Sequence, residues 1–129
     1  MRGSIECAVI GLVLVIGGCA GMGRGNRGEI QHVVIIWLKQ PADVEARHKL
    51  IERSYEFRKI PGVKSVAAGS VVPSDRKNVD STFDIGVVIT FEDEEALRAY
   101  DQNPIHQQAV KEVLMPLAAR VVIYDIWRE

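Results

Sequence analysis

The chain has 129 residues, of which 26% are charged and 47% hydrophobic, and its formal net charge at pH 7 is −1. These values are typical of one globular domain with a modest core. No basic run or basic-aromatic pattern is present, and the charge is balanced, so no nucleic-acid partner is expected.

Residues 1–18 have the pattern of a bacterial lipoprotein signal peptide. Arg2 gives a weakly positive start, and residues 8–16 are continuously apolar. A helix that crosses a bilayer needs about 20 apolar residues, so this run is too short and suits the apolar part of an export signal. The sequence IGGC at 16–19 resembles a lipobox, in which the cysteine is lipidated and becomes the N-terminus. We therefore predict lipidation at Cys19; the alternative is an uncleaved N-terminal anchor, which also places the domain at a membrane.

The two cysteines and the residue after the lipobox refine this prediction. Cleavage would remove Cys7 and lipidation would occupy Cys19, and the sequence has no other cysteine. The mature domain is therefore expected to lack disulfides and to be held by its core alone. Ala20 follows the lipobox, and by the rule known for enteric bacteria a residue other than aspartate there favours the outer membrane. The predicted location is the cell envelope, with the domain facing the periplasm.

Residues 19–28 are rich in glycine. Within them, residues 23–28 read G-x-G-x-x-G, the spacing of a dinucleotide-binding loop. Such a loop follows a strand and opens a helix, whereas this segment follows the signal and precedes a strand. We interpret residues 19–28 as a flexible tether and residues 29–129 as the folded domain.

The domain alternates between strand and helix patterns. The predicted elements are a strand at 30–39, a helix at 42–60, a weaker strand at 63–72, a polar loop at 73–82, a strand at 83–91, a helix at 92–102, a second helical piece from Asn103 to Pro116, and a strand at 120–127. The first helix is expected to bury a stripe made of Val44, Leu50, Ile51, Tyr55 and Phe57. Asn103 is a good N-cap, and Pro104 suits the first helical position. The order β-α-β-β-α-β predicts an α+β, ferredoxin-like sheet with helices on one face.

The first and third strands are apolar on both faces. Val33, Ile35 and Trp37 lie on the face opposite His32, and Gly86 and Val88 of the third strand are expected opposite them in the contact between sheets. Helices can cover only one face of this sheet, so the second face needs another cover. We predict a homodimer in which two sheets meet face to face, which forms a dimeric α/β barrel.

The sequence resembles the stress-responsive dimeric α/β-barrel (Dabb) family. The resemblance is carried by the segments HVVIIWLK, IPGVKSVAAGSVVPS, FDIGVVITFEDEEALRAYDQNPIHQQAV and VVIYDIW. Family members usually have a histidine in the first strand, a Pro-Gly pair before the second, and a tyrosine followed by His-Pro-x-His. His32, Pro61-Gly62, Tyr100 and Pro104-x-His106 match these positions, and Asn103 replaces the first histidine of the last motif.

The resemblance implies the dimeric barrel but no single activity. Many members have no assigned function, and some plant members act as polyketide cyclases in a pocket between sheet and helices. In those enzymes the positions matching His32, Tyr100 and His106 line the pocket and serve acid-base chemistry. Such enzymes can have a further histidine in the third strand, where this chain has Asp84 and Ile85. The fold also recurs in small haem- or quinone-handling oxygenases, an analogy of fold alone.

Three residues are candidates for catalysis. His106 lies in the first turn of a predicted helix, where the helix dipole disfavours the imidazolium form and leaves a neutral base. In the enzyme interpretation His106 is the base, Tyr100 steadies an enolate or phenolate, and His32 orients the substrate. The alternatives are that His106 lines a pocket without catalysis or bonds a nearby backbone group, and that His32 is a satisfied core residue. The predicted ligand-binding residues are Val34, Ile36, Ile85, Val87 and Tyr55.

Two classes of function remain open, and the binding of a small hydrophobic ligand is favoured. The alternative is a small enzyme of polyketide-cyclase-like or oxygenase-like type. No cofactor is expected, because no cofactor motif stands in a fitting context. No metal site is expected either, because the three histidines are scattered and no HExxH motif exists. The acidic run at 92–95 is interpreted as a solvated helix start.

Overall fold

The computed structural model describes residues 28–129, and the predicted signal peptide and Cys19 lie outside that range. The elements are β1 (Ile30–Leu38), α1 (Val44–Tyr55), the 3-10 turn η1 (Glu56–Lys59), β2 (Val63–Ser70), β3 (Ile85–Phe91), α2 (Glu94–Gln102), α3 (Pro104–Ala109), the π turn η2 (Val110–Leu114), α4 (Met115–Leu117) and β4 (Ala118–Trp127). No helix in this range is long and apolar enough to cross a membrane.

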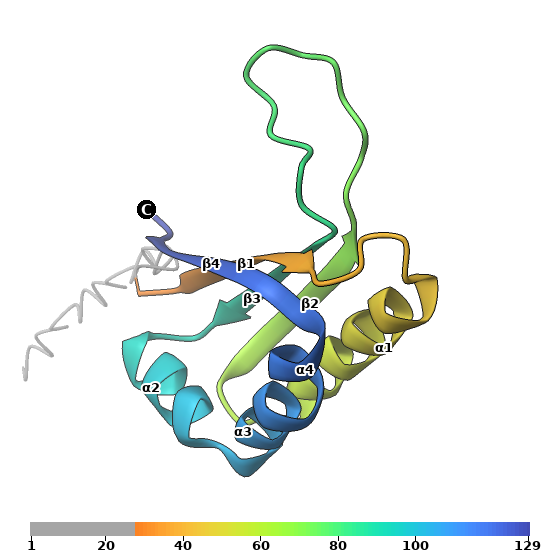
Figure 1. Ribbon diagram of the computed structural model, residues 1–129. Coiled ribbons are helices and arrows are strands. Elements are labelled where there is room, and N and C mark those ends of the chain that lie inside the picture. The colour runs from red at the N-terminus through yellow and green to blue at the C-terminus, as the bar shows by residue number, and fades with distance from the viewer. Residues whose placement is uncertain (1–27) are drawn as a thin grey trace, which may run out of the picture.

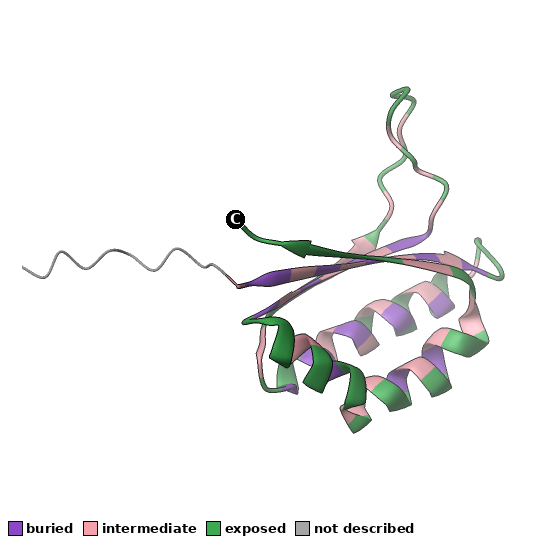
Figure 2. Ribbon diagram, turned by 90° about the vertical axis from the view of Figure 1, so that its left-hand side faces the viewer, coloured by how far each residue is buried: buried purple, intermediate pink, exposed green. Residues whose placement is uncertain are grey.

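The four strands form one antiparallel sheet in the order β2-β3-β1-β4. All of the helices pack on one face of this sheet, and the other face is open (Figures 1 and 2). This arrangement confirms the predicted α+β, ferredoxin-like fold. The first and last strands of the chain, β1 and β4, are neighbours, so residues far apart in the sequence lie side by side.

The core lies between the sheet and the helices. Residues of β1 alternate strictly between buried and half-buried, and the buried set faces the helices. The buried hydrophobic residues are Ile30, Val34, Ile36, Leu38, Ala46, Leu50, Phe57, Ile60, Val66, Ile85, Val87, Ile89, Phe91, Tyr100, Ala109 and Val113. Each large apolar side chain that folding removes from water contributes about 1.5–3 kcal/mol.

Side-chain caps fix where the helices begin. Asp43 accepts a hydrogen bond from the Ala46 backbone N–H, and Asp93 caps α2 in the same way. Asn103 ends α2 and caps α3 through a 2.9 Å bond from the Ile105 N–H, with Pro104 at the first position, as predicted. Together, Asn103 and Pro104 set the angle between α2 and α3.

Gly62 joins the first helical segment to β2 in a backbone conformation with φ of +86°. A Cβ at this position would lie 2.5 Å from the Cβ of Ala96 on α2. Glycine is therefore required here both by the backbone angle and by the close approach of α2.

The predicted helices differ from the observed ones in two places. The helix expected at 42–60 becomes 3-10 after Tyr55, and Val44 is 54% exposed, so the predicted buried stripe was wrong at that residue. The buried side of α1 consists of Ala46, Leu50 and Ser54. The second helical piece contains a π turn and ends one residue after Pro116, at Leu117. Proline offers no N–H to the carbonyl four residues earlier and presses on it, which favours a wider turn just before it.

The open face of the sheet carries the apolar residues that the sequence placed there. Val33 pairs with Val88 on one side and with Tyr124 on the other, so these three share the face, together with Ile35 and Trp37. Tyr124 is 57% exposed. This face is continuous across β3, β1 and β4.

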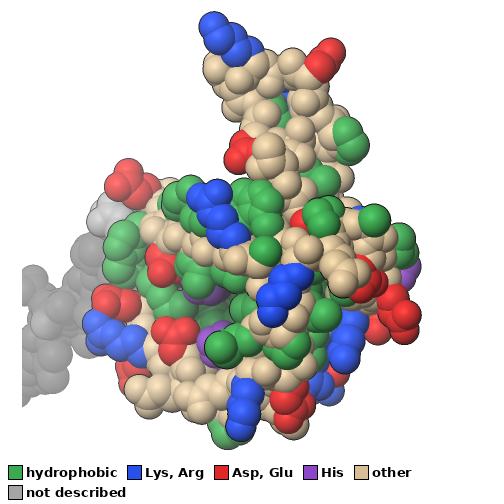
Figure 3. Space-filling view, viewed as in Figure 1, with side chains coloured by type: hydrophobic (Ala, Val, Ile, Leu, Met, Phe, Trp, Pro, Cys, Tyr) green, Lys and Arg blue, Asp and Glu red, His purple; other side chains and the backbone are tan. Residues whose placement is uncertain are grey.

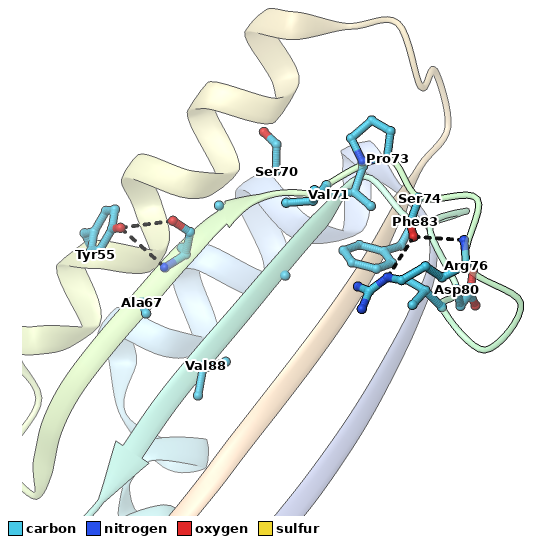
Figure 4. A pocket seen from close by; sticks show the side chains of 15 residues that line it. Tyr55, Ala67, Ser70, Val71, Pro73, Ser74, Arg76, Asp80, Phe83 and Val88 are labelled. Atoms are coloured by element: carbon cyan, nitrogen blue, oxygen red, sulfur yellow. Dashed lines mark hydrogen bonds between the residues drawn. The ribbon is translucent and has the colours of Figure 1, made fainter.

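The loop between β2 and β3 extends well beyond the sheet (Figure 1). At its base an open hollow lies over the edge of the sheet, between Tyr55 and loop residues that include Pro73, Ser74 and Phe83 (Figure 4). The loop is tied to β1 by a 3.0 Å hydrogen bond from Trp37 Nε1 to Thr82 Oγ1.

Candidate functional site

A cavity of about 260 Å³ lies between the covered face of the sheet and the helices. Its wall is predominantly hydrophobic and consists of His32, Val34, Ile36, Leu50, Arg53, Ser54, Phe57, Val87, Ile89, Tyr100, His106, Ala109, Val110, Leu114, Val121 and Ile123. Figure 3 shows a hollow in the surface with histidine side chains inside it among hydrophobic ones. An apolar cavity with a few polar groups is the usual form of a small-molecule site.

The three catalytic candidates from the sequence all line this cavity. His32 comes from β1, Tyr100 from α2 and His106 from α3. Of the five residues predicted to bind a ligand, Val34, Ile36 and Val87 line the cavity.

Ile85 and Tyr55 do not line the cavity. Ile85 faces the helices, but it is fully buried in the core and has no surface for a ligand. Tyr55 lies at the end of α1, where its hydroxyl donates a 3.0 Å hydrogen bond to the Ala68 carbonyl at the edge of the sheet. It borders the open hollow under the loop instead. These two residues therefore lie outside the cavity wall, and their part in ligand binding stays a prediction.

Tyr100 and His106 are stacked against each other. Their ring centroids are 4.1 Å apart and their planes are inclined by 30°. The stack depends on the break between α2 and α3, because the cap at Asn103 turns the chain so that His106 folds back onto Tyr100. His106 Nδ1 lies 3.4 Å from the Asp101 carbonyl oxygen.

The surroundings of this pair keep both side chains neutral. Burial lowers the pKa of His106 and nearby His32 lowers it further, against the opposing effect of Asp101. Burial also raises the pKa of Tyr100, and the charge of Asp101 adds to this rise. A neutral imidazole can accept a proton, and a neutral phenol can donate a hydrogen bond to a carbonyl or an oxyanion.

The Tyr100 hydroxyl has no hydrogen-bond partner among residues 28–129, although the residue is only 2% exposed. The rings of Phe57 and Phe91 pack on Tyr100 at centroid distances of 5.4 and 4.9 Å. Phe57 also lies 5.7 Å from the His106 ring. The aromatic contacts fix the position of the phenol and leave its hydroxyl available to a ligand.

His32 forms a pair with Asp125 that the sequence did not predict. Its Nδ1 lies 2.6 Å from Asp125 Oδ1 across the β1–β4 ladder, where the two residues are register partners. If Nδ1–H donates to the carboxylate, Nε2 is left as an acceptor. The His32 ring is 5.8 Å from the Tyr100 ring, so the three predicted residues form one group.

Arg53 is a charged residue of the cavity wall that sequence reasoning missed. It follows Leu50 by three positions on α1 and projects beside the apolar stripe of that helix. A basic residue in an amphipathic helix is ordinarily a surface residue, so its position gave no signal.

Residues 30–128 match the stress responsive A/B barrel domain (Dabb) family. The chain belongs to this family. No curated protein matches the sequence. The ferredoxin-like fold of the domain agrees with this assignment.

Three solved structures illustrate the similarity of fold. A Dabb family protein of Mesorhizobium loti with a ferredoxin-like fold is 20% identical and has a TM-score of 0.62, covering 80% of this chain and 99% of its own. A dimeric ferredoxin-like protein of unknown function from Thermobifida fusca is 21% identical, with a TM-score of 0.65 and coverages of 79% and 92%. The hydroxynitrile lyase of Passiflora edulis is 15% identical, with a TM-score of 0.70 and coverages of 80% and 95%. At these identities the similarity establishes the fold alone.

Within the part of the Dabb domain that the structure describes, no group of three or more His, Cys, Asp and Glu side chains could hold a metal ion. The side chains that can take part in chemistry at the cavity include His106 and His32 as proton acceptors, Tyr100 as a hydrogen-bond donor, and Arg53 as a fixed positive charge.

Proposed function

We propose that this Dabb domain binds a small hydrophobic ligand in the cavity between its sheet and its helices. The observation that carries the proposal is the cavity itself, with a volume of about 260 Å³ and walls built mainly from Val, Ile, Leu and Phe side chains. Transfer of a ligand's apolar surface from water into such a site contributes about 25 cal/mol per Å².

The cavity is built into the core. Val34, Ile36 and Val87 are all 9% exposed or less and form its floor on the sheet. Leu50 of α1 and Ala109 of α3 are similarly buried and form the opposite wall. A site held on both sides by regular elements is largely preformed, so little ordering is required when a ligand enters.

A cavity-filling substitution tests this proposal. The Val87→Phe variant of the full chain should lose the thermal stabilisation that octanol gives to the unaltered chain, because the larger ring occupies the ligand's space. Val44→Phe, on the exposed side of α1, is the matched control and should keep it. Equal responses of the three proteins to octanol would show that the ligand binds elsewhere.

A second candidate function is a small enzyme of polyketide-cyclase-like or oxygenase-like type. It is favoured by the stacked pair of His106 and Tyr100, in which a neutral base lies beside a hydroxyl without a partner. In that case His106 takes a proton, Tyr100 donates a hydrogen bond to the developing enolate or phenolate, and His32 orients the substrate. The name of the Passiflora edulis structure shows that this fold supports an enzyme in that protein.

The test of the second candidate separates binding from turnover. A ligand found by thermal shift is incubated with the unaltered chain and with the His106→Ala and Tyr100→Phe variants. Catalysis predicts that both variants still bind the ligand but no longer convert it. If the unaltered chain binds the ligand and does not convert it, the enzyme candidate is contradicted and the binding function is supported.

We infer further that the domain forms a homodimer through the open face of its sheet. Val33, Ile35 and Trp37 lie on that face, and the Thermobifida fusca protein of the same fold is described as dimeric. An exposed apolar face of this extent is a common mark of a protein interface. The dimer would cover the face that the helices leave open.

The location that we propose is the bacterial cell envelope, with the domain tethered to the outer membrane through a lipid on Cys19 and facing the periplasm. The support is the lipobox-like sequence at 16–19 and the Gly-rich segment that follows it. In membrane fractions, the unaltered chain should require detergent for release, whereas Cys19→Ser should be soluble. A soluble, unlipidated chain that retains Met1 would contradict the anchor.

A further inference from the structure

We propose that Arg53 is a specificity residue of the cavity and that the ligand is an amphiphile with an apolar body and one anionic group, such as a carboxylate. This inference rests on the proposed binding function, because it names the chemical class of the ligand in the same cavity. Among residues 28–129, Arg53 is the only Lys or Arg in the cavity wall. All other charges that the wall can carry belong to titratable histidine and tyrosine side chains.

The hydrogen bonds of Arg53 show that its guanidinium is only partly satisfied by the protein. Nη1 donates a 2.9 Å bond to Glu56 Oε2. Nε is buried and has no partner among the described residues. Among the described residues the bond at Nη1 is the one that this guanidinium makes, so its positive charge can still bind an anionic group that a ligand supplies.

The guanidinium keeps one nitrogen, Nη2, for an acceptor from outside the chain. Nη1 is occupied by Glu56, and Nε is covered by protein atoms, so a ligand cannot reach it. An N–H of Nη2 can donate a charge-assisted hydrogen bond to a carboxylate oxygen, and such bonds are stronger than neutral ones. The Arg53 side chain is 27% exposed and belongs to the cavity wall, so an anionic head group can reach it while the apolar tail stays inside.

Arg47 provides a matched comparison on the same helix. Its Nε is also buried without a partner among the described residues, and its Nη2 donates to the Pro41 carbonyl. It does not belong to the cavity wall. If ligand binding changes only when Arg53 is replaced, the change arises at the cavity. If it changes equally when Arg47 is replaced, the change arises from α1 as a whole.

The test compares the binding of octanoate, octanol and octylammonium, which share an apolar tail and differ in the charge of the head group. Titration calorimetry on the full chain should give octanoate an affinity about tenfold higher than octanol, the factor that ~1.4 kcal/mol produces, with octylammonium the weakest. Arg53→Gln should lose this preference because octanoate binding weakens much more than octanol binding, and Arg47→Gln should behave like the unaltered chain.

Glu56→Gln separates ligand recognition from a purely structural ion pair. If Arg53 serves the ligand, removal of Glu56's negative charge should keep or strengthen octanoate binding, the opposite of Arg53→Gln. If Arg53 serves only Glu56, the two variants should behave alike, which would overturn the inference. If Arg53→Gln does not fold, the affinities of the unaltered chain for octanoate, octanol and octylammonium still test whether the cavity prefers an anionic head group.

The outcomes distinguish this inference from the proposed function. Equal binding of octanoate and octanol would overturn the assignment of Arg53 and leave the apolar ligand site in place. No binding of any of the three probes would overturn the proposed function, and the inference with it.

Discussion

The imidazole of His106 stacks on the phenol ring of Tyr100, with the centroids 4.1 Å apart. The two residues belong to different helices, and Asn103 and Pro104 at the junction bring them together. The protonation and the packing of one ring therefore affect the other, and both rings line the cavity. Substitutions at each position can separate these effects.

The two tyrosines Tyr100 and Tyr55 should respond differently to the loss of their hydroxyls. Tyr55→Phe removes a 3.0 Å bond to the Ala68 carbonyl and should lower the free energy of unfolding by about 1 kcal/mol. Tyr100→Phe removes a hydroxyl without a partner among residues 28–129, so the change should stay below about 0.5 kcal/mol. Urea unfolding measures both. Equal destabilisation would show that the Tyr100 hydroxyl is bonded in the native protein.

His106 should make stability depend on pH. Burial lowers its pKa in the folded state, whereas an unfolded histidine titrates near ~6.5. The unfolded chain therefore takes up the proton at a higher pH than the folded chain does. As the pH is lowered below about 6.5, the free energy of unfolding decreases until the pH reaches the pKa of His106 in the folded state. Denaturant unfolding at about pH 7.5 and about pH 5.5 should show a smaller difference for His106→Gln than for the unaltered chain.

His48→Gln is the control for this pH dependence, because His48 is exposed on α1. It should keep the difference seen in the unaltered chain. If His106→Gln keeps the full difference as well, the site does not hold His106 in its neutral form.

Asp125 should select the tautomer of His32. The 2.6 Å contact between His32 Nδ1 and Asp125 Oδ1 favours the Nδ1–H form, with Nε2 free to accept. Nitrogen NMR shifts of the His32 ring should show this tautomer in the unaltered chain. Asp125→Ala should move His32 toward the Nε2–H form that free imidazoles prefer, and an unchanged spectrum would show that another group orients the ring.

The homodimer depends on the centre of the open face. Val33 lies between its partners Val88 and Tyr124, so Val33→Arg would place an unpaired charge in the middle of the interface and weaken association at least about tenfold. Light scattering should give twice the mass of one chain for the unaltered protein and the mass of one chain for this variant. Val44→Arg, which changes an exposed position on α1, should remain dimeric. A monomeric unaltered chain with native secondary structure would contradict the dimer.

The fold could be predicted from the sequence because its main signals are local. The alternation of apolar residues in β1, the acidic N-cap of α2 and the pair Asn103-Pro104 each act over a few residues. The predicted stripe of α1 failed at Val44 because that residue is the first of the helix and lies on the side that faces solvent, whereas Ala46, Leu50 and Ser54 form the buried side.

The site could be predicted only in part, because some of its contacts depend on strand register. His32 and Asp125 are 93 residues apart in the sequence and meet only because β1 and β4 are neighbours in a fixed register. Tyr100 and His106 could be proposed from the sequence because they are close along the chain. Arg53 gave no such signal, since only the packing of α1 on the sheet turns it toward the cavity.

The central claim is that the cavity between sheet and helices binds a small hydrophobic molecule. Methyl NMR of the full chain during titration with octanol tests it most directly, because β1 offers an internal control. Val34 and Ile36 line the cavity, whereas Val33 and Ile35 lie on the open face of the same strand. We expect the methyl signals of Val34 and Ile36 to shift in a saturable way while those of Val33 and Ile35 stay in place. Shifts confined to Val33 and Ile35, or no saturable shift at all, would contradict the claim.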